Sequence, residues 1–338
     1  MNIGVIGTGN IGTDHIRRLA GQVSGARPSA VFDVDTERAG AIAAAVGATV
    51  HREAHDVIDD PAVDAVLIAS PGDTHADLVL ACIAADKPVL CEKPLATTSG
   101  AALKVVEAEA TLGRRLVQVG FMRRYDAGYL QLKSVLDSGQ IGEALMVHCV
   151  HRNPTVPPTF TTDMSLTDSV VHEIDVTRWL LDQEIVAVTV LGARQSPLAA
   201  EGLRDPKLVL LETESGVLVD VEIFVNARYG YDVRCEVVAA TGTVSLDTPS
   251  TGTVTRNGGR THLVQADWQE RFGQAYVDEL QAWVAGLHQG ITGGPSVWDG
   301  YAATAVAEAC ISSRGTRATV DLADRPSMYR PNMDRSTP

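Results

Sequence analysis

Three residues of this sequence have side chains suited to moving a proton and stabilising charge: Lys93, Asp168 and His172. Asp168 and His172 are four positions apart in a segment whose apolar residues predict a helix, so we expect them on the same helix face. A carboxylate beside an imidazole orients the ring and raises its proton affinity, which suits His172 to act as a general base toward an alcohol. A lysine ammonium near that alcohol would stabilise negative charge on its oxygen.

Each of these residues also has an ordinary structural interpretation. Lys93 follows Glu92, and the two could form a surface ion pair. Asp168 could cap the helix that carries the histidine, which would then be half-buried and hydrogen-bonded, while Asp175 pairs with Arg178. The spacing of the residues leaves these alternatives open.

A glycine-rich turn near the N-terminus predicts a nucleotide site. Gly7, Gly9 and Gly12 form the pattern G-x-G-x-x-G directly after the apolar run 3–6. Glycine permits a tight turn and close backbone approach, and the helix that follows presents free N–H groups to phosphate. Asp33 lies 21 residues beyond Gly12, at the end of the second expected strand, where an acid accepts hydrogen bonds from a ribose 2′-hydroxyl. Together these residues predict a dinucleotide site.

The acidic residue at position 33 favours NAD over NADP. A 2′-phosphate would face an uncompensated carboxylate there, because the next basic residue, Arg38, is already inside the expected helix. The alternative for Asp33 is a solvated acid at a strand end or a helix cap, although Asp35 is the better cap candidate.

The first 120 residues predict the elements that position these groups. Short apolar runs alternate with Ala-rich stretches of helical period, which is typical of a doubly wound α/β domain whose parallel sheet is covered on both faces. Such sheets bind ligands at the carboxyl ends of their strands, and Lys93 follows one of these ends. The expected strands are 3–6, 29–33, 65–70, 89–91 and 116–120, and the expected helices are 11–23, 36–46, 74–85 and 98–112, the last capped by Thr98 or Ser99.

Residues 121–330 predict a second, α+β domain with a large, mostly antiparallel sheet. Two alternating runs flank Ser215-Gly216, a two-residue connection typical of a hairpin. The tail after Arg325, and residues 331–338 above all, is expected to be loosely held. The expected strands are 208–214, 217–224, 233–239 and 243–246, and the expected helices are 272–286 and 298–313.

The composition indicates a folded protein that does not bind nucleic acid. Hydrophobic residues make up 45% of the 338-residue chain, and the net charge of -14 repels phosphate backbones and anionic lipid. The five cysteines are dispersed and lack zinc spacing, so we expect buried, reduced thiols and no metal site. No apolar run approaches the roughly 20 residues of a membrane helix, and the N-terminus has no signal-peptide pattern, so a cytoplasmic protein without membrane contact is expected.

Polar residues gather at three further places in the expected second domain: 122–125, 151–154 and 229–232. A polyhydroxylated ligand needs such mixed donors and acceptors, because each buried hydroxyl without a partner costs about 1 to 3 kcal/mol. Salt bridges and ordinary surface polarity would produce the same pattern, and the spacing does not separate these interpretations.

The motifs together resemble the oxidoreductase family of glucose–fructose oxidoreductase, inositol dehydrogenase and rhizopine catabolism proteins, Gfo/Idh/MocA. Glu92-Lys93-Pro94 is typical of the broad family, whereas the long middle motif and His-Arg-Asn-Pro are similar to members that act on inositol. The resemblance spans both expected domains, and the segments that carry it are 7–12, 91–98, 117–126, 151–155 and 171–176.

This resemblance implies NAD-dependent oxidation of myo-inositol at C2 to 2-keto-myo-inositol (scyllo-inosose) by a homotetramer built through its C-terminal sheets. His172 would take the hydroxyl proton, Asp168 would orient it, and Lys93 would bond the reacting hydroxyl. The resemblance also implies substrate contacts from Met122, Arg123, His151, Asn153 and Tyr231, and cofactor contacts from the glycine turn, Asn10, Ile11, Asp33, Val34, Ser70, Pro71, His75 and Glu92.

Three other functions are compatible with all or part of this pattern. A dehydrogenase for another inositol isomer or a sugar would share every motif, since pocket geometry sets stereochemistry. An NADP-dependent relative is disfavoured by Asp33. A non-catalytic NAD-binding sensor would keep the glycine turn but need not keep Lys93, Asp168 and His172 together.

Overall fold

The chain forms two compact units in a computed structural model that describes residues 1–246, 253–313 and 315–330. Unit 1 contains Met1–Gly120, Val277–Thr304 and the segment from Leu322, and unit 2 contains Phe121–Tyr276 and Ala305–Asp321. The chain thus returns to unit 1 twice after its first 120 residues, through parts of α8 (Trp268–His288) and α9 (Val297–Ser313) and through the C-terminal segment.

Unit 1 is built on a six-stranded parallel sheet. The strand order is β3-β2-β1-β4-β5-β6, so the direction of winding reverses between β1 and β4, and ligands bind at the carboxyl edge beside such a reversal. The central strands are apolar and buried, because helices cover both faces. The strands are β1 (Asn2–Ile6), β2 (Arg27–Phe32), β3 (Thr49–Val50), β4 (Ala65–Ile68), β5 (Val89–Glu92) and β6 (Val117–Gly120).

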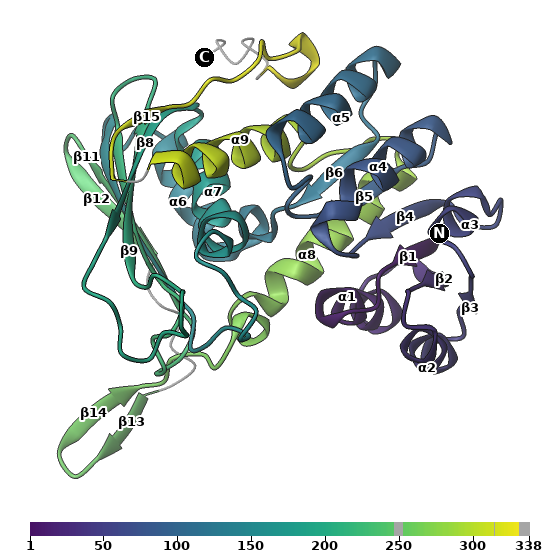
Figure 1. Cartoon of the computed structure of the whole chain (residues 1–338), viewed down its shortest axis with the longest axis horizontal. Coiled ribbons are helices and arrows are strands. Elements are labelled where there is room, and N and C mark those ends of the chain that lie inside the picture. Colours follow the sequence, from purple (N-terminus) through teal and green to yellow (C-terminus); the bar gives the residue numbers. More distant parts are fainter. Residues whose placement is uncertain (247–252, 314, 331–338) are drawn as a thin grey trace. The chain divides into compact units, whose positions relative to one another are not determined.

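Helices pack on both sides of this sheet (Figure 1). On one side, Ile16 and Leu19 of α1 form a core with Val31 of β2 and with Leu280 and Trp283 of α8. The helices are α1 (Asn10–Gly21), α2 (Thr36–Val46), α3 (Ala54–Asp59), α4 (His75–Ala84) and α5 (Ser99–Leu112), with a 3-10 turn, η1 (Gly72–Thr74), before α4.

Local capping agrees with the sequence. The Asp35 side chain accepts from the Arg38 N–H at the start of α2, and Thr98 accepts from the Ala101 N–H at the start of α5. Both caps were expected. Elements β3 and α3 were not predicted, because a strand of two residues and a helix of six are too short to show a period.

Unit 2 is built on a seven-stranded mixed sheet of order β12-β11-β7-β10-β9-β8-β15. All neighbours are antiparallel except β10 and β7, and β9 and β10 form the expected hairpin, in which Leu211 faces Val219. Buried and half-buried residues alternate along both strands, as expected for a sheet with one packed face. The strands are β7 (Ala144–Arg152), β8 (Ile185–Gly192), β9 (Lys207–Thr213), β10 (Leu218–Phe224), β11 (Asp232–Ala239), β12 (Gly242–Leu246) and β15 (Ala318–Thr319).

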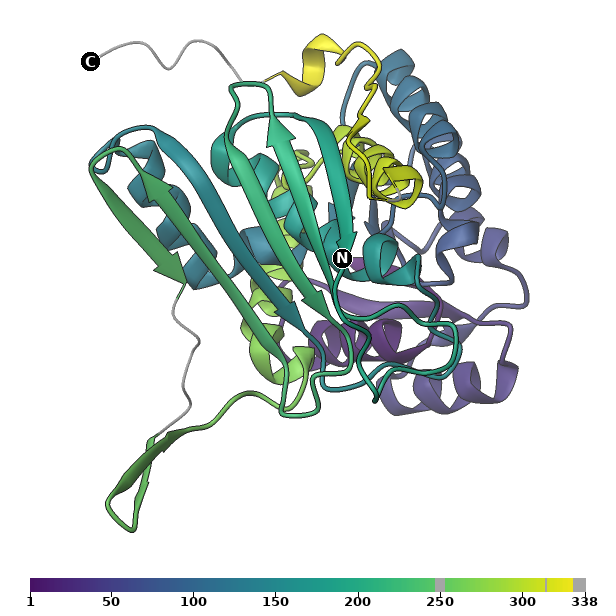
Figure 2. The same cartoon turned by 60° about the vertical axis from the view of Figure 1, so that its left-hand side comes forward.

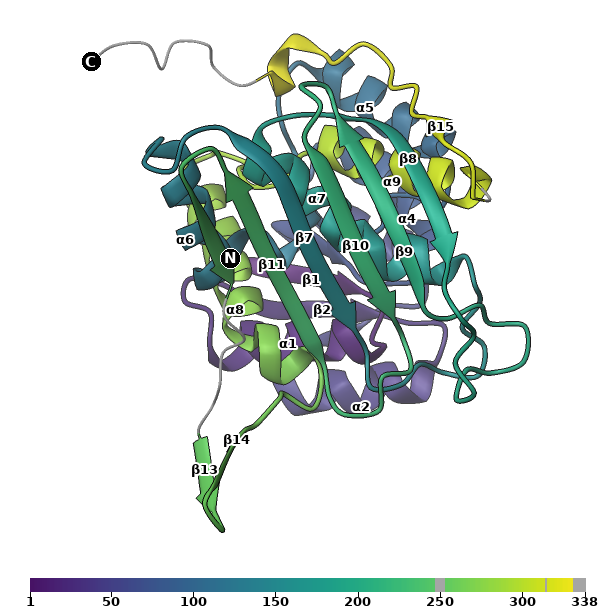
Figure 3. The same cartoon turned by 90° about the vertical axis from the view of Figure 1, so that its left-hand side faces the viewer.

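Helices α6 (Ala127–Asp137) and α7 (Val171–Leu181) pack against one face of this sheet. Seen from the opposite side in Figure 3, no helix of the described part of unit 2 covers the sheet. A two-stranded hairpin, β13 (Thr253–Arg256) with β14 (Gly259–His262), extends away from it (Figure 2).

The segment after Arg325 is better held than expected. Tyr329, in the 3-10 turn η4 (Ser327–Tyr329), is buried, and its hydroxyl donates to Glu109 Oε2 at 2.7 Å. The expectation of a loosely held tail is therefore wrong for 327–330, because an aromatic ring and a buried hydrogen bond fix the chain there; residues 331–338 lie outside the described residues. The five cysteines are free and buried, as expected. Among the described helices, none combines the length and the hydropathy needed to span a bilayer.

Candidate functional site

The glycine turn between β1 and α1 forms a backbone cradle at the carboxyl edge of the unit 1 sheet. Gly7 has a φ of 97°, and a Cβ on it would lie 2.5 Å from the Ala69 carbonyl group. A Cβ on Gly12 would lie 2.0 Å from the Gly7 oxygen, whereas no described atom lies within 4 Å of a Cβ on Gly9. Packing of the turn therefore requires glycine at positions 7 and 12, whereas Gly9 faces open space.

The N-terminus of α1 fits a phosphate group. Gly9 is its N-cap, and no side chain among the described residues caps it. The first N–H groups of the helix, including those of Asn10 and Ile11, remain available to an anion, which the positive end of the helix dipole also attracts.

Asp33 is fixed against this turn. It is 7% exposed; its Oδ2 accepts from the Thr8 N–H at 2.6 Å and from the Thr8 hydroxyl at 2.9 Å, and its Oδ1 accepts from the Asp35 N–H at 2.9 Å. Burial raises the pKa of Asp33, but these bonds and Arg38 outweigh burial, so its pKa lies below the ordinary value. The alternative of a solvated acid at the strand end is therefore wrong for Asp33. The next residue, Val34, is by contrast 87% exposed and presents an apolar side chain.

The expectation of an uncompensated carboxylate at Asp33 is wrong, because Arg38 pairs with it. Arg38 lies in α2 as expected, but its Nη2 donates to Asp33 Oδ1 at 2.7 Å and its Nε donates to the Thr8 hydroxyl at 3.3 Å. The first turn of α2 follows β2 closely, so the long arginine side chain reaches back to the strand end.

The other expected cofactor residues of unit 1 lie at the carboxyl ends of β4 and β5. The Ser70 and Thr74 hydroxyls are 2.7 Å apart, and Pro71 begins η1. The two ring nitrogens of His75 lie 2.7 Å from the Pro94 carbonyl oxygen and 2.8 Å from that of Ser70. His75 therefore links the loops that follow these two strands.

Glu92 fixes the backbone that carries Lys93. Its Oε1 is 2.7 Å from His15 Nε2, and its Oε2 accepts from the Lys93 N–H at 3.1 Å. Glu92 is only 4% exposed, so it is not the surface residue that the alternative interpretation assumed. The Lys93–Pro94 peptide bond is cis.

In unit 2, His172 lies in the first turn of α7, whereas Asp168 lies before that helix. Ser165–Val170 form a π-helical turn, η3, and α7 begins at Val171. The expected continuous α-helix is therefore wrong, because the π turn is wider than an α turn and changes the spacing between the two residues. The N-cap of α7 is Val170, so Asp168 does not cap it either. His172 is 7% exposed and meets the Phe121 ring edge-on.

Glu173, next to His172, is the centre of a buried polar cluster that also contains Arg123, His151 and Tyr231. Arg123 Nη1 donates to Glu173 Oε1, and His151 Nδ1 lies 3.0 Å from Glu173 Oε2. His151 Nδ1 is also 3.2 Å from Arg123 Nη2, and His151 Nε2 is 3.5 Å from the Tyr231 hydroxyl. The His151 and His172 rings are 6.5 Å apart.

Opposing effects act on the charges of this cluster. Burial alone would raise the pKa of Glu173, but Arg123 and His151 outweigh burial and hold the pKa below its usual value. Burial alone would lower the pKa of Arg123, but Glu173 outweighs it and raises the pKa well above its usual value. Both groups are therefore charged although each side chain is 1% exposed.

The structure separates the expected substrate residues into two groups. Arg123 and Met122 are almost fully buried, and Arg123 is bonded to Glu173, so it supports the cluster. The Oδ1 atom of Asn153 is buried and has no hydrogen-bond partner among the described residues, which suits it to accept from a ligand hydroxyl. Glu173 was not predicted as a site residue, although it lies inside the motif 171–176.

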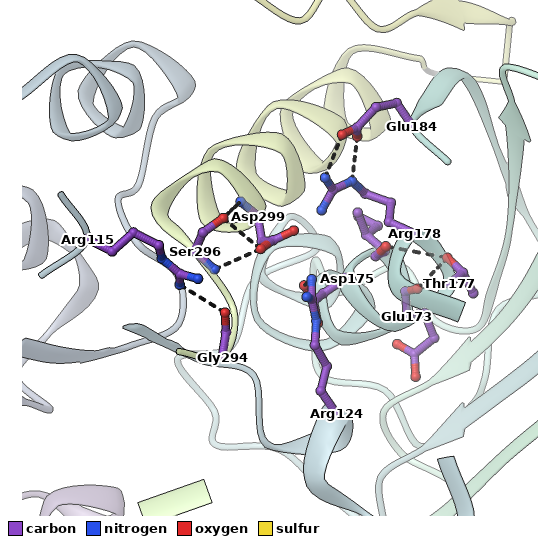
Figure 4. Close-up of polar contacts among 11 residues, drawn as sticks. Arg115, Arg124, Glu173, Asp175, Thr177, Arg178, Glu184, Gly294, Ser296 and Asp299 are labelled. Atoms are coloured by element: carbon purple, nitrogen blue, oxygen red, sulfur yellow. Dashed lines mark hydrogen bonds and ion pairs between the residues drawn. The ribbon is translucent and has the colours of Figure 1, made fainter. Parts of the chain in front are cut away.

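Helix α7 is fixed by further polar contacts (Figure 4). Arg124 Nε donates to Asp175 at 2.9 Å, and Arg178 Nε donates to Glu184 at 2.6 Å. The Thr177 hydroxyl donates to the Glu173 carbonyl oxygen at 2.6 Å. These contacts hold the helix that carries His172. Among the described residues, no group of acidic, histidine or cysteine side chains has the arrangement of a metal site.

A parallel sheet with a glycine turn and an acid after β2, followed by a second mixed sheet, defines an NAD-binding two-domain oxidoreductase. The chain belongs to the Gfo/Idh/MocA oxidoreductase family. Residues 1–121 match the family's NAD-binding Rossmann fold, and residues 133–322 match its C-terminal alpha/beta domain.

Known relatives are similar along nearly the whole chain. Inositol 2-dehydrogenase 2 of Saccharopolyspora erythraea is 55% identical over 334 residues, covering 98% of each chain. Myo-inositol dehydrogenase of Lactobacillus casei, solved with NAD(H) and myo-inositol, has a TM-score of 0.95 and 38% identity and covers 97% of this chain and 99% of its own. Apo scyllo-inositol dehydrogenase of the same organism has a TM-score of 0.88 and 25% identity, with 95% and 98% coverage.

Proposed function

We propose that this protein is an NAD-dependent dehydrogenase that oxidises myo-inositol at C2 to 2-keto-myo-inositol. The observation that carries the proposal is the 38% identity, over 97% of the chain, to a structure that holds both NAD(H) and myo-inositol. The phosphate cradle at Gly9, the ionised Asp33 and the buried polar cluster at Glu173 support it.

The residues of unit 1 fit the cofactor. The glycine turn and the α1 N-terminus would hold the pyrophosphate, Asp33 would accept from a ribose hydroxyl, and the exposed Val34 would pack against the adenine. The bound nicotinamide would accept the hydride that leaves the inositol carbon.

The chain's own residues would bind the substrate and move the proton. His172 would take the hydroxyl proton, Asp168 would orient the imidazole, and Lys93 would donate a hydrogen bond to the oxygen as it gains negative charge. Asn153 and Tyr231 would bind the remaining hydroxyls, because the Asn153 Oδ1 atom is buried without a hydrogen-bond partner among the described residues and the Tyr231 hydroxyl lies in the buried polar cluster.

A dehydrogenase for scyllo-inositol or another polyol is the second candidate, supported by the similarity to a scyllo-inositol dehydrogenase. The purified protein would be mixed with NAD and, separately, with myo-inositol, scyllo-inositol, D-chiro-inositol and D-glucose at mildly alkaline pH, where a histidine base is neutral. Fastest NADH formation with myo-inositol supports the proposal, and a preference for another polyol supports the second candidate. NADH binding without turnover of any polyol would contradict both.

We also propose a homotetramer that uses the uncovered face of the unit 2 sheet. Half-buried leucines, Leu208 and Leu210 of β9, lie on that face, because their neighbours Val209 and Leu211 are fully buried. Leu210→Arg would disrupt such an interface, whereas Leu130→Arg, at an exposed position of α6, is the control. Light scattering after size exclusion would show a smaller assembly only for the first variant, and an unchanged mass for both would contradict the proposal.

A further inference from the structure

The Asp33 carboxylate accepts hydrogen bonds at all of its acceptor positions. Two donors belong to Thr8, one is the Asp35 N–H and the fourth is the Arg38 guanidinium. A carboxylate has about four acceptor sites, so a ribose hydroxyl can bond to Asp33 only where one of these donors leaves.

Arg38 is the donor that is free to leave. Thr8 is fully buried, and two of the four donors are backbone N–H groups fixed by the turn and by the start of α2. The Arg38 side chain, by contrast, is 45% exposed, and water can replace its contacts at low cost.

We infer that Arg38 is a cofactor-specificity residue whose guanidinium binds the 2′-phosphate of NADP, so that unit 1 accepts a 2′-phosphorylated adenine nucleotide as a second ligand. With NAD, the 2′-hydroxyl takes the place of Arg38 on Asp33. With NADP, the guanidinium stays beside the ribose and pairs with the phosphate, which it suits by charge and by its planar array of donors.

The surrounding charges keep NAD the better ligand. Arg38 Nη1 also pairs with Asp35 at 2.9 Å, so two carboxylates and one guanidinium lie beside the ribose position. Glu37, in the first turn of α2, adds another negative charge nearby. The net charge around a 2′-phosphate is therefore negative, and Arg38 reduces the discrimination against NADP without abolishing it.

The test compares the dissociation constants of NADH and NADPH, measured by calorimetry without substrate. The variants are Arg38→Ala and a control, Arg27→Ala, which removes an exposed arginine from the start of β2, at the end of that strand remote from Asp33. We expect the wild type to bind both ligands, NADH more tightly. Arg38→Ala should weaken NADPH binding about tenfold relative to NADH, the effect of losing one hydrogen bond to a charged group. Arg27→Ala should leave the ratio unchanged.

Two results would overturn the inference: no NADPH binding to a wild type that binds NADH, or an equal change of both constants in Arg38→Ala. Adenosine 2′,5′-bisphosphate and AMP provide a second pair of probes that lacks the nicotinamide. Arg38→Ala should weaken binding of the bisphosphate relative to AMP, as it weakens NADPH relative to NADH. The inference rests on the proposed function only in that unit 1 binds a dinucleotide. A wild type that binds neither NADH nor NADPH contradicts both the proposed function and the inference on Arg38. NADH binding without inositol turnover contradicts the proposed function alone, because the binding test does not involve turnover.

Discussion

Removing the Glu173 carboxylate should destabilise the protein far more than removing a surface carboxylate. Arg123 and Glu173 are each 1% exposed, and both Arg123 and His151 bond to the carboxylate. Glu173→Ala would leave the Arg123 cation buried without its partner. Breaking a buried ion pair in this way costs about 3 to 5 kcal/mol.

The assay is urea unfolding followed by circular dichroism. The control is Glu212→Ala, because Glu212 pairs with Arg317, whose side chain is 55% exposed, and exposed pairs contribute little. We expect a large loss of unfolding free energy for Glu173→Ala and no measurable change for the control. The double variant Arg123→Met with Glu173→Leu should lose less than Glu173→Ala, since it leaves no unpaired charge.

The pH dependence gives the same prediction an independent check. The pKa of Glu173 is lower in the folded protein than its ordinary value of 4.5, so its contribution to stability is complete above that value and is lost as pH falls through the folded pKa. Glu173→Ala should therefore flatten the acid side of the stability curve. A loss below about 1 kcal/mol at neutral pH, together with an unchanged acid limb, would refute the reasoning, because the Arg123 charge would then be hydrated.

Three further predictions concern the site and its surroundings. His172→Ala should lower kcat for inositol oxidation by about 10²- to 10⁴-fold, the usual effect of losing a general base, and steady-state turnover equal to the wild type would contradict its assigned role. Asp33→Ala should raise the KM for NAD and reduce the preference for NAD over NADP, and an unaltered ratio of the two kcat/KM values would remove Asp33 from ribose recognition. Burial lowers the pKa of Lys207 from its ordinary value of 10.5 to about 8, so on raising the pH the folded state loses the ammonium proton before the unfolded state does. The unfolding free energy of the wild type should therefore rise between pH 8 and 10.5 relative to that of Lys207→Met. Parallel plots of unfolding free energy against pH for the two proteins, measured by urea titration, would argue against this prediction.

Local features of the chain were predictable because their causes lie within a few residues of one another. The turn at Gly7 needs a positive φ, and Asp35 and Thr98 cap the helices that they precede. Apolar runs and helical periods likewise determined the doubly wound domain and the hairpin at Ser215-Gly216. The sequence by itself therefore determined the fold class, the dinucleotide turn and the family.

The partners of the charged side chains were decided by the tertiary structure. The contacting pairs among Glu173, Arg123, His151 and Tyr231 are separated by 22 to 80 positions along the chain, and only the folding of unit 2 brings these residues together. The π turn before α7 changed the relation of Asp168 to His172 that an α-helical spacing predicted.

The same holds for the ribose position in unit 1. The sequence placed Arg38 inside a helix, and only the path of the chain from β2 into α2 brings its guanidinium onto Asp33. Periodicity and capping act between neighbours in the chain, whereas the choice of an ion-pair partner depends on which strands and helices meet. The residue types therefore revealed which chemistry is possible, and the packing decided which groups are held in place to perform it.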